Sequence, residues 1–219
     1  MNSDLVADQM RISDLRRLID DESVMFDIGA NIGKFSKELR SLSKNGIIYA
    51  FEPIPIAYNS LKKLKLGNKF HPKNLAISNE TGIVDFFVNE SDIGSSILKP
   101  TPNQSSKWLN FSHKIEVETK RLDNFIISEG LNSISLLKSD CEGFDLKVLE
   151  SAGSYLRPDF IKSVLVEVSF HEFHEFQDKY FDIFKLLSDK NYFLANFYPH
   201  YNRNEWLWWA DALFLPNTS

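Results

Sequence analysis

Short apolar runs alternate with amphipathic segments along most of the chain. Runs of about five apolar residues, and runs in which apolar and polar residues alternate, are typical of strands that lie inside or on the edge of a core. Such strands are expected at 24–28, 47–51, 74–78, 83–88, 114–119, 134–138, 163–168, 192–197 and 207–215.

The segments between these runs carry apolar residues at helical spacing. Helices are expected at 4–20 and 33–42, from near Pro55, and at 122–128, 143–152 and 177–188. This alternation predicts an α/β fold with a mainly parallel sheet and helices on both faces. Ligands of such sheets bind at the carboxyl ends of the strands. We expect residues 1–21 to form a helix that packs on the core and residues 22–219 to form one domain.

Residues 89–112 carry no clear period. A loop of this length within a compact domain is usually functional or disordered. Gly94 offers a hinge, and Ser95 and Ser96 follow it. We therefore expect a mobile flap that closes over the active site and excludes water, with Ser95 and Ser96 near the substrate.

The composition narrows the class of partner. Hydrophobic residues make up 43% of the 219 residues, charged residues 25%, and the net charge is −5. An acidic chain gives no electrostatic support to a nucleic-acid partner. Cys141 is the only cysteine, which fits a reducing compartment, and the first residues lack the apolar core of a signal peptide. We expect a cytoplasmic protein with no membrane span; no feature of the sequence specifies an oligomer.

The segment VMFDIGANIGKF, residues 24–35, is predicted to be a strand, a glycine turn and the start of a helix. Dinucleotide turns read G-x-G-x-x-G, and their second glycine lets the backbone approach a pyrophosphate. Here Gly29 and Gly33 are four residues apart and Asn31 stands in the central position. Asp27, at the end of the strand, suits a cationic ligand better than a phosphate. S-adenosylmethionine, with an ammonium, a sulfonium and no phosphate, fits this turn.

Glu52 lies at the end of the second predicted strand, in the sequence FEP with Pro53. An acid at this place accepts hydrogen bonds from the ribose hydroxyls of a bound nucleotide, in NAD sites as well. Glu52 alone therefore does not discriminate between the two cofactors. A glycine turn without any ligand is the remaining alternative.

These residues belong to a series of blocks that resembles one known family. VMFDIGANIGKFS, IIYAFEPIPIAYNSLKKL, ISNETG, DIGSSIL and LLKSDCEGFDLKVLESA are similar, in this order, to the FkbM family of S-adenosylmethionine-dependent methyltransferases. The resemblance covers roughly residues 22–170. It implies a Rossmann-like, seven-stranded sheet with an antiparallel last strand, and O-methylation of a sugar, a glycan or another metabolite.

The resemblance also implies roles for single residues. It assigns cofactor contacts to Asp27, Gly29, Asn31, Gly33 and Glu52, with Ala76 near the adenine. Pro53 and Asp140 are further candidates for cofactor binding. In the block K-x-D-x-E-G this chain has Ser139 and Cys141 where hydrophobic residues are common in the family.

Methyl transfer to a hydroxyl needs positioning and help with the hydroxyl proton. Lys138 and Asp140, at the carboxyl end of a predicted central strand, are candidates for this help, and Glu142 is a candidate on the substrate side. Lys138 is interpreted either as a base of depressed pKa or as an ion partner of a nearby acid. Asp140 is interpreted either as a catalytic residue or as the cap of the helix that begins near Glu142.

Glu167 ends the next strand and is a candidate to bind substrate, orient a base or contribute to a metal site; the alternative is a buried acid paired with Lys138. His171 and His174 are three residues apart, on one face of an expected helix. His171 is a candidate base, and His174 is interpreted as a solvated residue. Trp206, Trp208 and Trp209 are expected to pack in the core rather than to stack on sugars.

The favoured function is a methyltransferase that uses S-adenosylmethionine and a small-molecule or glycan acceptor. A divalent metal is compatible with this chemistry but is not predicted, because no compact set of three strong ligands is visible. The alternatives are an NAD-dependent oxidoreductase and a non-catalytic module that binds S-adenosylmethionine.

Overall fold

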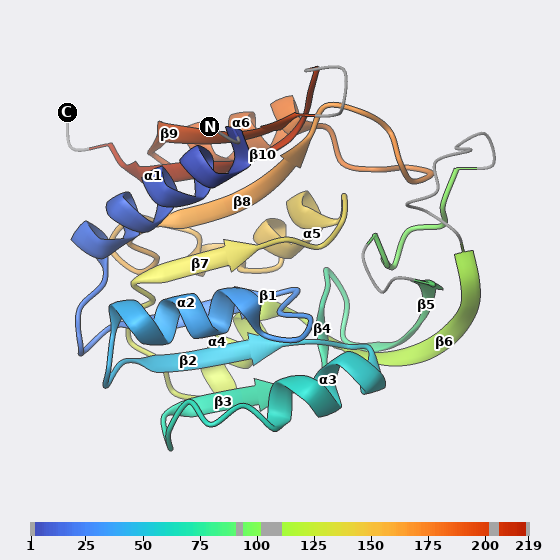
Figure 1. Ribbon diagram of the computed structural model, residues 1–219, viewed down its shortest axis with the longest axis horizontal. Helices are drawn as coiled ribbons and strands as arrows, with labels where there is room; N and C mark the ends of the chain where they lie inside the picture. The colour runs from blue at the N-terminus through green and yellow to red at the C-terminus, as the bar shows by residue number, and fades with distance from the viewer. Residues whose placement is uncertain (1–2, 91–93, 102–110, 202–205, 218–219) are drawn as a thin grey trace.

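A computed structural model describes residues 3–90, 94–101, 111–201 and 206–217, and it contains one large sheet between two layers of helices (Figure 1). The sheet has seven strands in the order β3-β2-β1-β7-β8-β10-β9. Their bounds are Phe70–Lys73 (β3), Ile47–Phe51 (β2), Val24–Ile28 (β1), Leu136–Ser139 (β7), Val164–Ser169 (β8), Leu207–Pro216 (β10) and Tyr192–Tyr201 (β9). Only β10 runs antiparallel to its neighbours. The predicted α/β fold, with a mainly parallel sheet and an antiparallel last strand, is confirmed.

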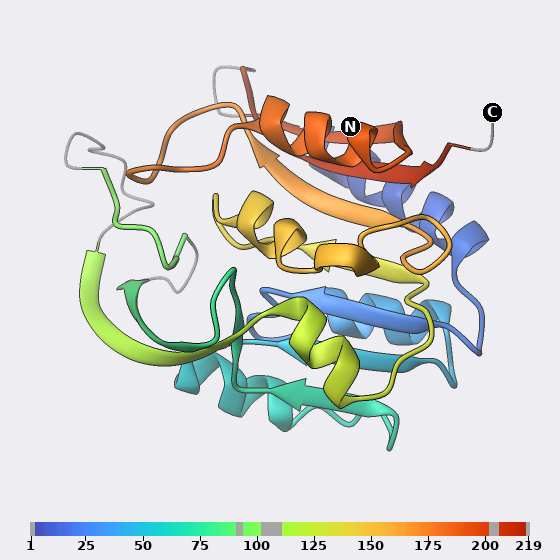
Figure 2. The same ribbon diagram turned by 180° about the vertical axis from the view of Figure 1, so that it is seen from behind.

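Each face of the sheet is covered by its own set of helices. α1 (Ser3–Leu18), α2 (Lys34–Leu42) and α3 (Pro55–Lys62) lie in front of the sheet in Figure 1. Seen from behind, α4 (Leu122–Ser128), α5 (Asp145–Glu150) and α6 (Tyr180–Asp189) cover the opposite face (Figure 2). A short 3₁₀ helix, Gly153–Tyr155, follows α5. The two faces bury separate apolar clusters because strand residues alternate between them.

An aromatic cluster fixes the strands of the first βαβ unit against α4. The ring of Phe125 in α4 lies edge-on to Phe51 in β2, with centroids 4.8 Å apart, and 5.7 Å from Phe26 in β1. All three side chains are buried. Edge-to-face packing of this kind adds to the hydrophobic gain of burial. The carboxyl ends of β1 and β2 are therefore held on a rigid support.

The third strand of the large sheet is not where the sequence pattern placed it. β3 is Phe70–Lys73, whereas the predicted run 74–78 contributes β4 (Ala76–Ile77) to a separate sheet with β5 (Gly82–Asn89) and β6 (Phe111–Lys120). β3 contains Pro72 and the polar residues His71 and Lys73, so it has no apolar pattern that would predict a strand. An edge strand nevertheless tolerates proline. The strand predicted at 74–78 is thus present, over Ala76–Ile77, but it pairs with β6. Pairing with β2, not local hydrophobicity, selects the edge strand of the large sheet.

Candidate active site

The residues singled out from the sequence converge at the carboxyl ends of the parallel strands. Asp27 in β1 lies beside Lys138 in β7 in the strand register. Glu52 follows β2, Asp140 follows β7, and Glu167 lies near the end of β8. Strands of the same direction bring these ends to one edge of the sheet. Five charged residues from distant parts of the sequence therefore share one edge.

The turn after β1 uses all of its own N–H groups. The N–H groups of Gly29 and Ala30 donate to the Phe51 carbonyl, at 3.1 and 2.9 Å. The Asn31 N–H donates to Glu52 Oε2 at 2.8 Å. The Ile32 N–H donates to Asn31 Oδ1, and the Gly33 N–H to the Ala30 carbonyl. No N–H from Gly29 to Gly33 is left for a phosphate in this conformation, unlike the turn of a dinucleotide site.

Gly29 and Gly33 are required for close packing as well as for their backbone shape. Both have positive φ angles, +76° and +83°. A Cβ on Gly29 would lie 1.9 Å from the carbonyl oxygen of Asp140, so only glycine lets the ends of β1 and β7 approach this closely. A Cβ on Gly33 would meet the side chains of Leu61 and Leu64, near the end of α3.

Glu52 is buried and held by two backbone donors. Its carboxylate accepts from the N–H groups of Asn31 and Ile54, both at 2.8 Å, which ties the first turn to the start of α3. Burial raises the pKa of Glu52 to about 7, although the two N–H donors and Lys138 oppose the rise. Pro53 is half-buried next to Glu52, and its carbonyl accepts from Asn74.

Ala76 lies in β4, outside the large sheet. It is buried and clusters with Ile54 and Ala57, at the start of α3. This position is on the Glu52 side of the edge, where the resemblance places the adenine.

Lys138 is buried between two carboxylates. Its ammonium lies 3.3 Å from Asp27 Oδ1 and 3.1 Å from Asp140 Oδ2, and it donates to the Gly29 carbonyl at 3.2 Å. The other oxygen of Asp27 accepts from the Ser36 hydroxyl at 2.6 Å. Burial alone would lower the pKa of Lys138, but Asp140 and Asp27 raise it above the usual value. The interpretation of Lys138 as a base of depressed pKa was therefore wrong.

Asp140 does not cap the following helix. α5 begins only at Asp145, and its first N–H groups donate to Asp178 Oδ2, from Leu146 at 2.9 Å and from Lys147 at 3.4 Å. The capping interpretation of Asp140 was wrong because Asp178, in the loop after β8, accepts these hydrogen bonds instead. Asp140 instead pairs with Lys138 and keeps a third of its side chain exposed.

The turn after β7 is held from within by Asp145. This buried carboxylate accepts from the Cys141 N–H at 3.0 Å and from the Ser139 hydroxyl at 2.5 Å. Burial raises the pKa of Asp145 to about 7, and the two donors reduce that rise only in part. The turn that carries Asp140 is therefore rigid.

Residues 94–101 are anchored above this turn. The Gly94 N–H donates to Glu142 Oε1 at 2.9 Å, and the Gly94 carbonyl lies 3.0 Å from His174 Nε2. Ser95 and Ser96 are buried; the Ser95 hydroxyl accepts from the Asn89 N–H. The described part of the predicted flap, 94–101, forms a strap bound to the turn after β7 and to His174, and its movement on ligand binding stays a prediction. Residues 91–93 and 102–110 of that prediction lie outside the described residues.

The two histidines do not share a helix face. Residues 170–179 form a loop after β8, and α6 begins at Tyr180. His174 is buried, so its interpretation as a solvated helix residue was wrong, and burial lowers its pKa. His171 is exposed, and its ring lies 6.5 Å from that of Trp208.

Glu167 is half-buried, and no cation lies within ion-pair distance of it in the described part of the chain. The expected pairing with Lys138 was wrong, since Lys138 pairs with Asp27 and Asp140. Burial, together with the negative charges of Asp140 and Glu142, raises the pKa of Glu167 well above its usual range. In the described residues, no group of three or more His, Cys, Asp or Glu side chains is arranged to hold a metal.

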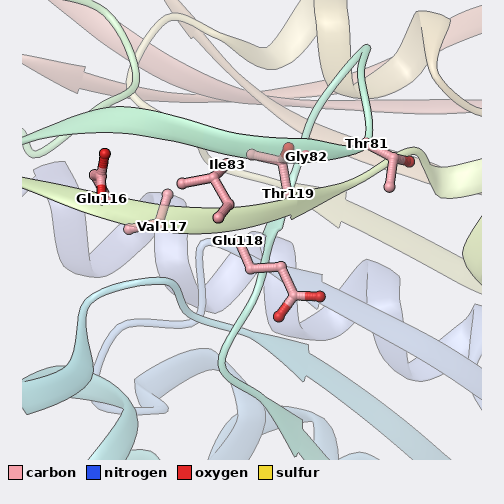
Figure 3. A pocket seen from close by; sticks show the side chains of 7 residues that line it. All are labelled: Thr81, Gly82, Ile83, Glu116, Val117, Glu118 and Thr119. Atoms are coloured by element: carbon pink, nitrogen blue, oxygen red, sulfur yellow. The ribbon is translucent and has the colours of Figure 1, made fainter.

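A hollow also lies on the second sheet (Figure 3). It is lined by the start of β5 and the end of β6, from Thr81 to Ile83 and from Glu116 to Thr119. Ile83, Glu116 and Glu118 are exposed there. Among its lining residues only Thr119 is a buried polar side chain, whereas several charged groups meet at the sheet edge, which remains the candidate site.

Comparison with known proteins agrees with this geometry. Residues 27–194 match the family model described as methyltransferase FkbM domain. The chain is 29% identical over 166 residues to the 2-O-methyltransferase NoeI of Sinorhizobium fredii, which covers 71% of this chain and 67% of that protein. It is 26% identical over 163 residues to methyltransferase 1 of Beauveria bassiana, covering 68% and 65%.

Solved structures show the same fold. The crystal structure of methyltransferase FkbM from Methylobacillus flagellatus aligns with a TM-score of 0.59 at 15% identity, over 90% of this chain and 44% of that one. This chain thus spans about two thirds of the two curated relatives and under half of the solved protein. No helix in the described ranges has both the length and the apolar composition needed to cross a bilayer.

The close approach at Gly29 is testable by Gly29→Ala, with Gly67→Ala as a matched control. Both glycines have positive φ, but a Cβ on Gly67 meets nothing within 4 Å. The control should lose about 1–2 kcal/mol of stability from the left-handed backbone. Gly29→Ala should lose about 1–3 kcal/mol more, because its Cβ overlaps the Asp140 carbonyl. Urea unfolding measures both; equal losses would contradict the close approach.

The buried acids predict that stability falls as the pH rises. Burial raises the pKa of Asp145 in the folded chain to about 7, from an ordinary value of 3.8. Its protonated form therefore stabilises the fold fully below about 3.8, and this contribution disappears as the pH rises through about 7. Asp145→Asn should flatten the decline in unfolding free energy between pH 5 and pH 8, whereas Asp189→Asn, at the exposed end of α6, should not. An unchanged slope in Asp145→Asn would refute this assignment.

Proposed function

Because this chain belongs to the FkbM methyltransferase family, we propose that it transfers a methyl group from S-adenosylmethionine to a hydroxyl of a sugar, a glycan or a small metabolite. The choice of cofactor rests on the turn after β1, whose N–H groups already have hydrogen-bond acceptors within the chain. The acidic side chains nearest to this turn at the edge are Asp27, Glu52 and Asp140, with Lys138 neutralising part of their charge. Carboxylates suit ammonium, sulfonium and ribose hydroxyl groups and repel a pyrophosphate. An NAD-dependent oxidoreductase is not favoured.

We assign some charged residues of this sheet edge to the cofactor and others to the acceptor. Glu52 would hold the ribose hydroxyls, with Pro53 and Ala76 on the adenine side. Asp140, whose side chain is one-third exposed beside Lys138, would bind the ammonium group of S-adenosylmethionine. When bound, S-adenosylmethionine supplies a methyl group activated by the positive charge on its sulfur.

Glu167 is the side chain best suited to take the acceptor proton. It is half-buried, has no cation partner among the described residues, and its pKa is raised by burial and by neighbouring acids. In its ionised form, a carboxylate of raised pKa is a stronger base than an ordinary glutamate, although a smaller fraction of it is ionised at neutral pH. Glu167 would accept the hydroxyl proton as the acceptor oxygen takes the methyl group, which bound S-adenosylmethionine would supply, with the electron pair of the S–CH₃ bond remaining on its sulfur. His171, exposed in the loop after β8, remains the alternative base.

The acceptor side is formed by the strap 94–101 and the loop after β8. We propose a small-molecule or glycan acceptor, supported by the name of the relative NoeI, a 2-O-methyltransferase. The net charge of −5 again favours this class over nucleic acid. The single cysteine, Cys141, supports the cytoplasm as the place of action.

Calorimetry with S-adenosylmethionine, S-adenosylhomocysteine and NAD tests the cofactor. The first two should bind and NAD should not. Glu52→Ala should weaken binding by about 1.5–3 kcal/mol, roughly tenfold to 150-fold, because a charged hydrogen-bond acceptor is lost. Glu52→Gln should lose less, and Glu116→Gln, on the exposed face of β6, should bind normally. Binding of NAD alone would refute the proposed cofactor.

Turnover with a panel of sugars and glycosides, read as formation of S-adenosylhomocysteine, tests catalysis. Glu167→Gln should lower turnover by about 10²–10⁴-fold, the scale of general-base catalysis, with cofactor affinity near that of the parent chain. Glu150→Gln, at the exposed end of α5, is the matched control. Binding without turnover on any acceptor would favour the non-catalytic module, and a near-normal rate in Glu167→Gln would shift the base to His171.

A further inference from the structure

The N-terminal helix α1 places a buried guanidinium next to β10, the neighbour of the strand β8 that contains Glu167. Arg11 lies on α1, and its side chain is only 11% exposed. Its nitrogens lie 2.5 Å from Asp211 Oδ2 in β10, 3.2 Å from Glu38 Oε2 in α2, and 3.1 Å from Asp8 Oδ1. One cation thus joins the helix layer to the sheet.

Asp211 is the direct cross-strand neighbour of Glu167. The two residues face each other in the antiparallel register of β10 and β8. Directly opposed side chains lie on the same face of a sheet, with Cβ atoms about 4.5–5.5 Å apart, and like charges there repel. Arg11 therefore neutralises the carboxylate that stands opposite the proposed base.

The charges on this face form two separate clusters. In one cluster, Lys138 forms ion pairs with Asp27 and Asp140. In the other, Arg11 forms ion pairs with three carboxylates, those of Asp211, Glu38 and Asp8. The ring of Phe35 in α2 lies between the two cations, 5.4 Å from the Arg11 guanidinium and 5.6 Å from the Lys138 ammonium. Glu167 lies on the strand between the clusters and pairs with neither cation.

We propose that Arg11 is a positioning residue that acts through Asp211 to set the charge state of Glu167, which makes α1 part of the acceptor side of the site. This inference rests on the proposed function, in which Glu167 takes the acceptor proton. The titratable and charged groups around Glu167 come from several elements. They are Lys138, Asp140, Glu142 and Asp145 from β7 and the segment after it, Asp211 from β10, and Arg11, Asp8 and Glu38 from α1 and α2.

Two single variants should move the proton affinity of Glu167 in opposite directions. Arg11→Met leaves Asp211 uncompensated, so the pKa of Glu167 should rise by about one unit, which is about tenfold in proton affinity. Asp211→Asn removes the opposing negative charge and leaves Arg11 nearby, so the pKa of Glu167 should fall by a similar amount. Both variants break the same ion pair. A merely structural role of that pair would therefore affect Glu167 alike in both.

The titration is read by carbon NMR of the folded protein labelled with ¹³C at glutamate carboxyl groups. The Glu167 signal is assigned by its loss in Glu167→Gln, and no acceptor is needed. Arg11→Lys should restore most of the parent titration because it keeps the positive charge. Arg17→Met is the control on the same helix, since Arg17 is 76% exposed and pairs only with Asp14 among the described residues. If Arg11→Met unfolds, Asp211→Asn and Arg11→Lys still decide the sign.

Opposite shifts in the two variants, with none in Arg17→Met, support the inference. Shifts in the same direction, or no shift, would overturn it. The acid limb of the turnover profile should move together with the Glu167 titration in each variant. A titration that moves while the acid limb stays fixed would instead show that Glu167 is not the base, which is a failure of the proposed function and not of the coupling through Arg11.

Discussion

The ammonium of Lys138, buried between Asp27 and Asp140, is the interaction on which the candidate site depends. It joins β1 to β7 through side chains, at the level where the carbonyl of Asp140 lies against the α-carbon of Gly29. Without Lys138, the negative charges of the buried Asp27 and the one-third-exposed Asp140 would repel each other. Without the two carboxylates, burial would lower the pKa of Lys138.

This constraint explains how the remaining parts of the edge are arranged. With Lys138 committed to Asp27 and Asp140, the other acids must find hydrogen bonds or accept protons. Glu52 and Asp145 are satisfied by backbone N–H groups, and Asp145 also by the Ser139 hydroxyl. Glu167 has neither kind of partner among the described residues, which is why it stands out as a base. An excess of buried carboxyl groups costs stability at neutral pH, a cost common at catalytic sites.

The acceptor side is assembled from segments far apart in the chain. The strap 94–101, the turn after β7 and the loop after β8 meet around the peptide group of Gly94, which is bound by Glu142 on one side and by His174 on the other. Helix α1 closes the opposite face through Arg11. In the proposed site, the cofactor and acceptor regions share the β7 end, so we expect a change in the turn that carries Asp140 to affect both.

The sequence by itself determined the α/β fold, most helices and strands, and the turn from Asp27 to Gly33, because periodicity and glycine spacing are local signals. It also indicated which acids lie at strand ends. Only the tertiary structure decided that Pro72 belongs to the edge strand, that Asp178 rather than Asp140 supports α5, that His174 is buried and that Arg11 faces Asp211. These outcomes depend on pairings between residues 22 to 200 positions apart, and the charge state of a buried group follows from its neighbours in space, which no local pattern encodes.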